Sequence, residues 1–253
     1  MRSANALILA VAAAAALAPA ASPPAGAQTM QAGQLVTPFS AAKPGTALPQ
    51  GWEPLTFGSL KTPTKYDFVE NDGTVVARAR ADGAAGGLNF PVKFDIRSAP
   101  FVEYRWKIAK LIDGADNRVA AKEDSPVRLV LGFDGDKAKL TFKERTASAL
   151  AKSATGKDLP YAQLIYIWSN GEPVGTVIEN SHTRRVRMVV AATGAGSAGK
   201  WVTISRNVQE DFKRAFGEEP GTLTDVGIMT DTDNTGASVE AWYGDIRFLA
   251  AKP

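Results

Sequence analysis

The chain has 253 residues, with 29 basic and 26 acidic side chains and a formal net charge of +3. It contains no cysteine, which excludes disulfides, thiolate zinc sites and cysteine nucleophiles. The near balance of charge disfavours nucleic-acid binding, which usually requires a clustered basic face.

The first 27 residues have the pattern of a secretory signal peptide. Arg2 supplies a positive charge, residues 6–21 form an apolar run, and Ala25-Gly26-Ala27 is a small-x-small cleavage sequence. We expect cleavage before Gln28 and a periplasmic or secreted protein. An N-terminal membrane anchor is the alternative, which the short, alanine-rich run disfavours. No later stretch approaches 18 apolar residues, so we expect no further membrane span.

Residues 28–50 are polar and rich in Pro, Gly and Ala, and we interpret them as a mostly irregular leader. Residues 51–250 are expected to form a single domain, because no Ser/Gly/Pro-rich linker separates two apolar halves.

Alternation of apolar and polar side chains is the dominant pattern of this domain. In residues 101–108 the even positions are apolar and positions 103, 105 and 107 are charged, which predicts a half-buried strand. The same pattern predicts strands over residues 127–133, 139–143 and 185–190 and, more weakly, over 74–80 and 225–230. The side chains predicted to face inward in the 139–143 and 185–190 strands are Leu140, Phe142, Val186, Met188 and Val190.

Three further signals complete the expected fold. Residues 164–168 are apolar on both faces, which is typical of a central strand covered on each side. Asp134-Gly135 predicts a hairpin between the strands on either side of it. Residues 205–216 have helical apolar spacing and end before Gly217, and a helical turn is also predicted near 146–152. We therefore expect an all-β antiparallel sandwich or jelly roll with one or two short helices.

The sequence contains no convincing motif for catalysis or for nucleotide binding. The glycines of residues 194–199 match a dinucleotide fingerprint in letters, but the strand-like residues 200–204 follow where a helix is required. His182 is the only histidine, which excludes two-histidine metal sites, and no G-x-S-x-G motif is present. We predict no catalytic residue and no organic cofactor.

Residues 231–236 have oxygen-bearing side chains at alternate positions followed by glycine, as in the first half of a calcium-binding loop. Asp231 and Asp233 are the candidate ligands of a structural calcium ion. The twelfth position is Trp242 instead of glutamate, so the segment is not an EF-hand. A tight turn held by Asp and Asn side chains is the alternative.

An ordered series of motifs resembles the bacterial domain-of-unknown-function family 3047, whose members are usually exported. The motifs are Leu48-Pro49-Gln50-Gly51-Trp52-Glu53-Pro54-Leu55, Tyr104-Arg105-Trp106-Lys107, Asp124-Ser125-Pro126-Val127-Arg128, Tyr166-Ile167-Trp168, Met229-Thr230-Asp231-Thr232-Asp233-Asn234-Thr235 and Trp242-Tyr243-Gly244-Asp245-Ile246. The resemblance covers residues 38–249 and implies an architecture without an established activity.

The end of the chain, residues 243–248, is also similar to the last strand of galactose-binding-like jelly rolls, although Gly244 stands where an acidic residue often precedes the aspartate. That likeness implies a sandwich of the binding type.

These observations lead to the hypothesis of a non-catalytic module that binds a carbohydrate or cell-envelope glycan, with aromatic rings stacking on the sugar and polar groups bonding its hydroxyls. A glycan hydrolase or lyase that uses Asp/Glu and Arg is one alternative, and an envelope scaffold is another. The residues from which we expect the site to be drawn are Arg105, Asp116, Arg118, Asp124, Arg128, Trp168, Asn180, Arg184, Asp231, Asp233, Asn234 and Trp242.

Overall fold

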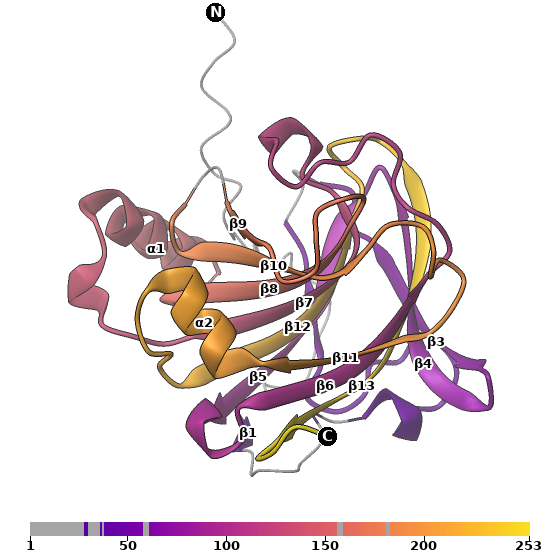
Figure 1. Cartoon of the computed structure of the whole chain (residues 1–253), viewed down its shortest axis with the longest axis horizontal. Coiled ribbons are helices and arrows are strands. Elements are labelled where there is room, and N and C mark those ends of the chain that lie inside the picture. Colours follow the sequence, from indigo (N-terminus) through magenta and orange to yellow (C-terminus); the bar gives the residue numbers. More distant parts are fainter. Residues whose placement is uncertain (1–27, 30–35, 37, 58–60, 156–158, 181–182) are drawn as a thin grey trace, which may run out of the picture.

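The computed structural model describes residues 28–29, 36, 38–57, 61–155, 159–180 and 183–253. The predicted signal segment and His182 lie outside these residues. Within them the chain forms two β-sheets packed face to face, with two α-helices at the periphery (Figure 1). The prediction of a β-sandwich with one or two helices is confirmed.

The larger sheet has the strand order β1-β5-β12-β7-β8-β10-β9, and β2 pairs with β5. Its strands are β1 (Gln28–Thr29), β2 (Glu53–Leu55), β5 (Ala85–Phe94), β7 (Ser125–Phe133), β8 (Ala162–Ser169), β9 (Val177–Glu179), β10 (Val186–Thr193) and β12 (Leu223–Asp231). The β1–β5 and β8–β10 pairs are parallel, and the other pairs are antiparallel.

The smaller sheet has the order β11-β6-β13-β4-β3 and is antiparallel throughout. Its strands are β3 (Lys65–Asn71), β4 (Thr74–Asp82), β6 (Phe101–Ile108), β11 (Val202–Asn207) and β13 (Ser238–Leu249). The pairing of β13 with β6 is irregular between Tyr243 and Ile246, so Gly244 and Asp245 interrupt the ladder.

The core lies between the sheets and is rich in aromatic side chains. The even positions of β6 are buried, as the alternation predicts, and Trp106 lies 6.4 Å from Trp168 of β8 between ring centroids. The odd positions 103, 105 and 107 are half-buried and face outward. The smaller sheet therefore presents a row of charged side chains on its outer face.

The predicted strand over residues 139–143 is wrong, and so is the Asp134-Gly135 hairpin. Helix α1 (Phe142–Thr155) occupies this region, and Phe142 is exposed. A capping box starts the helix: the Thr141 amide donates to the Glu144 carboxylate (2.7 Å), and the Glu144 amide donates to the Thr141 hydroxyl (3.3 Å). This local bonding overrides an alternation of only two apolar residues.

The strand predicted over residues 185–190 exists as β10, but its predicted inward face is wrong. Val186, Met188 and Val190 belong to an apolar cluster on the outer face of the larger sheet, whereas Val189 joins the core between the sheets. Both faces of β10 are buried, so alternation alone could not identify the inner one.

The other helix, α2 (Val208–Phe216), follows the prediction closely. The Asn207 side chain caps its first turn by accepting from the Glu210 amide, and Gly217 ends it in the left-handed conformation at φ 72°. Among the described residues, no helix is long and apolar enough to cross a membrane.

Candidate functional site

Half of the predicted site residues meet at one end of the larger sheet. The start of β7 lies beside the end of β12, because Ser125 pairs with Asp231. Arg128 is 4% exposed; its guanidinium donates to the Asp231 carboxylate at 3.1 Å and to the Glu123 carbonyl. Asn180 in turn donates to both oxygens of the Glu123 carboxylate at 3.2 Å. We call Asn180, Glu123, Asp124, Arg128, Asp231, Asp233 and Lys61 the loop cluster.

Asp124 holds the loop after β12 in place. Its carboxylate accepts from the amides of Asn234 (3.2 Å) and Thr235 (2.8 Å) and from the Thr235 hydroxyl (2.6 Å). The Asn234 side chain donates to the Ala120 carbonyl at 3.1 Å. Such bonds are typical of a tight turn held by Asp and Asn side chains, the alternative to a calcium-binding loop for residues 231–236.

The candidate calcium ligands Asp231 and Asp233 lie together with Asp124, with one oxygen of each within 4.8 Å of the others. Lys61 forms an ion pair with Asp233, and Arg128 forms one with Asp231. Lys61 and Arg128 thus already neutralise two of the carboxylates that would bind a metal ion. The calcium site stays a prediction.

Asp231 has the most perturbed carboxyl group of this cluster. Burial raises its pKa from 3.8 to about 7, and the nearby Asp124 charge adds to the increase, while the Arg128 guanidinium opposes it. A carboxyl group that stays partly protonated near neutral pH is suited to proton transfer if substrate can reach it.

Four predicted residues lie away from this cluster. Trp168 is 1% exposed in the core, where its indole donates to the Gly194 carbonyl. Arg118 forms an exposed ion pair with Glu172, and Asp116 accepts from the Arg118 amide within its own turn. Arg184 lies on the surface. These side chains do not converge.

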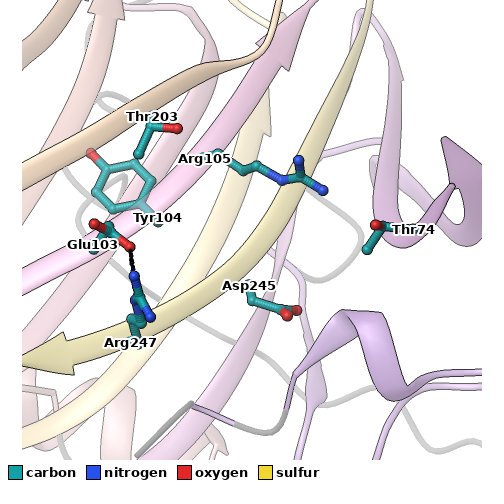
Figure 2. A pocket seen from close by; sticks show the side chains of 7 residues that line it. All are labelled: Thr74, Glu103, Tyr104, Arg105, Thr203, Asp245 and Arg247. Carbon is teal, nitrogen blue, oxygen red and sulfur yellow. Dashed lines mark hydrogen bonds and ion pairs between the residues drawn. The ribbon is translucent and has the colours of Figure 1, made fainter. Parts of the chain in front are cut away.

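The remaining two, Arg105 and Trp242, lie on the outer face of the smaller sheet, beside a hollow of about 310 Å³ (Figure 2). The residues that line this hollow are Thr74, Glu103, Tyr104, Arg105, Thr203, Asp245 and Arg247. They come from β4, β6, β11 and β13, which are brought together by the register of the sheet. We call this the Arg105 hollow.

Two contacts hold the Arg105 side chain in position. Its guanidinium lies over the Trp201 ring, 4.6 Å from the centroid. Its stem passes Gly244 so closely that a Cβ there would lie 2.6 Å from Arg105 Cγ. Figure 2 shows the guanidinium pointing toward Thr74. No described residue accepts a hydrogen bond from it or forms an ion pair with it.

The two carboxylates of the hollow are engaged. Glu103 accepts from the Arg247 guanidinium at 2.7 Å, across neighbouring strands. Asp245 accepts from the amide (2.9 Å) and the hydroxyl (2.5 Å) of Ser40. The Glu103 and Asp245 side chains are therefore held in place, whereas the guanidinium donors of Arg105 have no acceptor among the described residues.

An aromatic and cationic surface extends from the hollow along the sheet. The Lys107 ammonium lies 5.2 Å from the Trp201 centroid and 4.8 Å from the Trp242 centroid. The Trp201 indole donates to Asn71 at the end of β3 (3.2 Å) and to Asp72 in the turn that follows (2.9 Å), and these bonds fix the orientation of the ring.

The sequence pattern identified Arg105 and Trp242 but missed their neighbours. The charged odd positions of residues 101–108 indicated a solvent-facing row, and this was the available signal for Glu103 and Lys107. Asp245 and Arg247 could be joined to that row only by the pairing of β13 with β6.

A family model described as "Protein of unknown function (DUF3047)" matches residues 50–247, which is most of the chain. No curated protein sequence matches significantly.

Several solved structures show a distant similarity to this chain. The xyloglucanase domain of NopAA from Sinorhizobium fredii has 8% identity and a TM-score of 0.44, covering 85% of this chain and 100% of the domain. A family 30 carbohydrate-binding module of a Clostridium thermocellum cellulosomal cellulase has 10% identity and a TM-score of 0.35 (85% and 93% covered). A family 28 module specific for non-crystalline cellulose has 14% identity and a TM-score of 0.39 (90% and 99% covered). Superpositions this loose do not identify a ligand.

Proposed function

The chain belongs to the DUF3047 family, whose description assigns no activity, and we propose from its own geometry that it is a non-catalytic carbohydrate-binding protein. The observation that carries the proposal is the Arg105 guanidinium, held between Trp201 and Gly244 with its donors open to a hollow. Side chains that are held in place before binding lose little entropy when a ligand arrives.

The chemistry of the hollow suits a sugar. A guanidinium offers up to five N–H donors in a fixed plane, which can engage two neighbouring hydroxyl groups. The hydroxyls of Thr74 and Thr203 can both donate and accept, and the carboxylate of Asp245 keeps acceptor capacity beyond its bonds to Ser40. Such mixed donors and acceptors match the hydroxyl groups of a sugar ring.

The size of the hollow suggests how much of a glycan it holds. Its volume of about 310 Å³ lies at the lower end of the range for ligand pockets, roughly 300 to 1,000 Å³. One sugar residue would occupy it, and the rest of a chain would lie along the outer face of the sheet toward Trp201 and Trp242. We therefore propose binding to a glycan chain, with cell-envelope polysaccharide as the expected class.

Binding without cleavage is favoured by the state of the two carboxylates. Glycoside hydrolysis uses one carboxylic acid that stays protonated and a second carboxylate as base or nucleophile. In the Arg105 hollow, Glu103 is held by Arg247 and Asp245 by Ser40. Both carboxylates thus already accept hydrogen bonds from side chains of the fold, and such positioned acceptors suit the binding of sugar hydroxyls.

Isothermal titration against a panel of envelope and plant polysaccharides tests the proposal. At least one member should bind the wild-type chain, and Arg105→Ala should weaken that binding at least about tenfold, since a hydrogen bond from a charged donor contributes roughly 1.5 to 3 kcal/mol. The matched control is Arg118→Ala, which removes an exposed arginine outside the hollow. A flat response across the panel, or equal affinities of wild type and Arg105→Ala, would contradict the proposal.

An enzyme remains the second candidate because of the raised pKa of Asp231 and its contact with Arg128. It predicts release of reducing ends or unsaturated sugars from the polysaccharide that binds, with a rate that Asp231→Asn abolishes. Binding without product release over days would leave the first proposal standing alone.

We propose that the protein acts outside the cytoplasm. The support is the N-terminal sequence with Arg2, the apolar run 6–21 and the small residues before Gln28. Cell fractionation followed by intact mass measurement should recover a chain that begins at Gln28. A cytoplasmic chain that retains residues 1–27 would contradict export and would leave the glycan proposal to its own test.

A further inference from the structure

Helix α1 carries two large apolar side chains that are exposed in the described part of the chain. Among the described residues, the large hydrophobic side chains that are exposed are Phe142, Leu150, Val119 and Val174. Phe142 and Leu150, at 78% and 64% exposure, are the most exposed of the four, and both belong to α1. Figure 1 shows α1 at the edge of the molecule, outside both sheets.

The two apolar side chains share the outward face of the helix. Residues 142, 146 and 150 are spaced by four, so they lie along one side of an α-helix. The described side chains of α1 that are half-buried, Glu144 and Ser148, lie on the opposite side, toward the body of the protein. Phe142, Thr146 and Leu150 therefore form the part of α1 farthest from the sheets.

Positive charges flank this apolar stripe. Lys143 lies beside it on one side and Arg145 on the other, at about 100° per residue around the helix. Both side chains are exposed, and neither forms a hydrogen bond or ion pair with a described residue. The one acidic residue of α1, Glu144, faces the body, where it lies 3.7 Å from the Arg185 guanidinium.

We propose that α1 is a membrane-docking helix that lies flat on an anionic lipid bilayer. Phe142 and Leu150 would enter the boundary between headgroups and acyl chains, and Lys143 and Arg145 would contact the lipid phosphates. An apolar stripe flanked by cations is the arrangement of interfacial helices, in which shallow burial and charge attraction act together.

A bilayer fits this face better than a protein partner does. A stable protein interface buries roughly 800 Å² on each side with a continuous apolar centre. Here two large side chains lie about 12 Å apart along the axis, at 1.5 Å per residue, with the hydroxyl of Thr146 between them. The apolar area of this face is too small for a stable protein interface, but shallow insertion into lipid needs no continuous complementary surface.

The docking helix and the Arg105 hollow do not compete for space. In Figure 1, α1 lies at the left edge beside the larger sheet, whereas β6 and β13, which carry most of the lining of the hollow, belong to the smaller sheet and cross the lower part of the molecule. A chain resting on a bilayer through α1 would leave the hollow free, so the inference stands or falls independently of the glycan proposal.

Flotation of the purified chain with lipid vesicles tests the proposal. The vesicles are pure phosphatidylcholine and phosphatidylcholine with about one third phosphatidylglycerol. We expect binding to the anionic vesicles, at least fivefold loss in Phe142→Ser/Leu150→Ser, and a comparable loss in Lys143→Gln/Arg145→Gln. The matched control is Val119→Ser/Val174→Ser, which removes the other two exposed apolar side chains and should bind like wild type. All variants carry the same N-terminus, so any vesicle binding by the apolar run of residues 6–21 is equal in all of them.

Each result has a defined meaning. Equal flotation of Phe142→Ser/Leu150→Ser and wild type would overturn the proposal, as would no flotation of the wild type. Binding that does not distinguish neutral from anionic vesicles would overturn the role of Lys143 and Arg145. Light scattering that shows a dimer of the wild type and a monomer of Phe142→Ser/Leu150→Ser would assign the face to a second copy of the chain instead. All substituted positions are exposed, so the variants should fold.

Discussion

Two arginines, each on the outer face of a different sheet, have opposite surroundings. Arg128 is sealed in the loop cluster, where it contacts the Asp231 carboxylate and the Glu123 carbonyl. Arg105 lies in an open hollow, stacked on Trp201, with no acceptor among the described residues. The Arg128 guanidinium is buried and bonded to two oxygen acceptors, with its Nε unpaired, whereas the Arg105 guanidinium faces an open hollow with none of its donors paired to a described residue.

The difference shows how the fold itself can engage the side chains of an Asp- and Asn-rich segment. Asp124, Asp231 and Asp233 resemble ligand-binding residues in sequence, but in the structure they bond to one another's loops and to Lys61 and Arg128. Buried polar groups must be paired, so a dense polar segment tends to satisfy itself. Donors that the fold holds in place and leaves unpaired are the better indication of a binding site.

The largest effect should come from removing the sealed arginine. Arg128→Met leaves the Asp231 carboxylate buried without its charge partner and should lower the free energy of unfolding by about 3 to 5 kcal/mol. Arg105→Met should cost about 1 kcal/mol or less, because its ring contact is half-exposed. Urea unfolding followed by tryptophan fluorescence measures both. Similar losses in the two variants would remove the contrast between the two arginines.

The second effect is a pH dependence that belongs to the loop cluster. Because the pKa of Asp231 rises from 3.8 to about 7 on folding, its contribution to stability is present below about pH 4 and is lost as the pH rises through 7. The stability of wild type relative to Asp231→Asn should thus fall by about 4 kcal/mol between pH 4 and pH 8. Urea unfolding of both proteins across this range measures it, and parallel profiles would show that Asp231 titrates normally.

A smaller effect should follow from a substitution that displaces the Arg105 side chain but keeps the arginine. In Gly244→Ala the new methyl group would meet the Arg105 stem, so the guanidinium must shift. Affinity for the glycan identified in the panel should fall about fivefold, or about 1 kcal/mol. Gly171→Ala is the control, because a Cβ there meets no atom within 4 Å. Unchanged affinity in Gly244→Ala would mean that the placement of Arg105 is not important for binding.

The smallest effect should come from Arg118→Ala. Its ion pair with Glu172 is exposed, and such pairs contribute little because water screens them. We expect neither a measurable shift in the urea midpoint nor a change in glycan affinity. A clear loss of affinity would move the binding site toward the loop that contains Arg118.

Local patterns predicted much of the fold, because they depend on neighbouring residues. Residues 101–108 were identified with the right inner face, and the helix ending at Gly217 was placed within three residues of its start. The helical turn predicted near residues 146–152 lies within α1 (Phe142–Thr155), but the start of that helix was not predicted, although it is visible in the sequence as Thr141 followed by Glu144. The alternation of Leu140 and Phe142 favours a strand there, but the capping box of Thr141 and Glu144 starts a helix instead.

By itself, the sequence determined that strands dominate this chain, that the odd positions of β6 face solvent, and that export is expected. Only the tertiary structure decided which polar side chains are paired within the fold and which remain available to a ligand. The physical reason is that pairing is non-local: Asp231 meets Arg128 through the β7–β12 register, and Arg105 meets Gly244 through the irregular β6–β13 pairing. Sheet register links residues more than a hundred positions apart, and no local pattern records it.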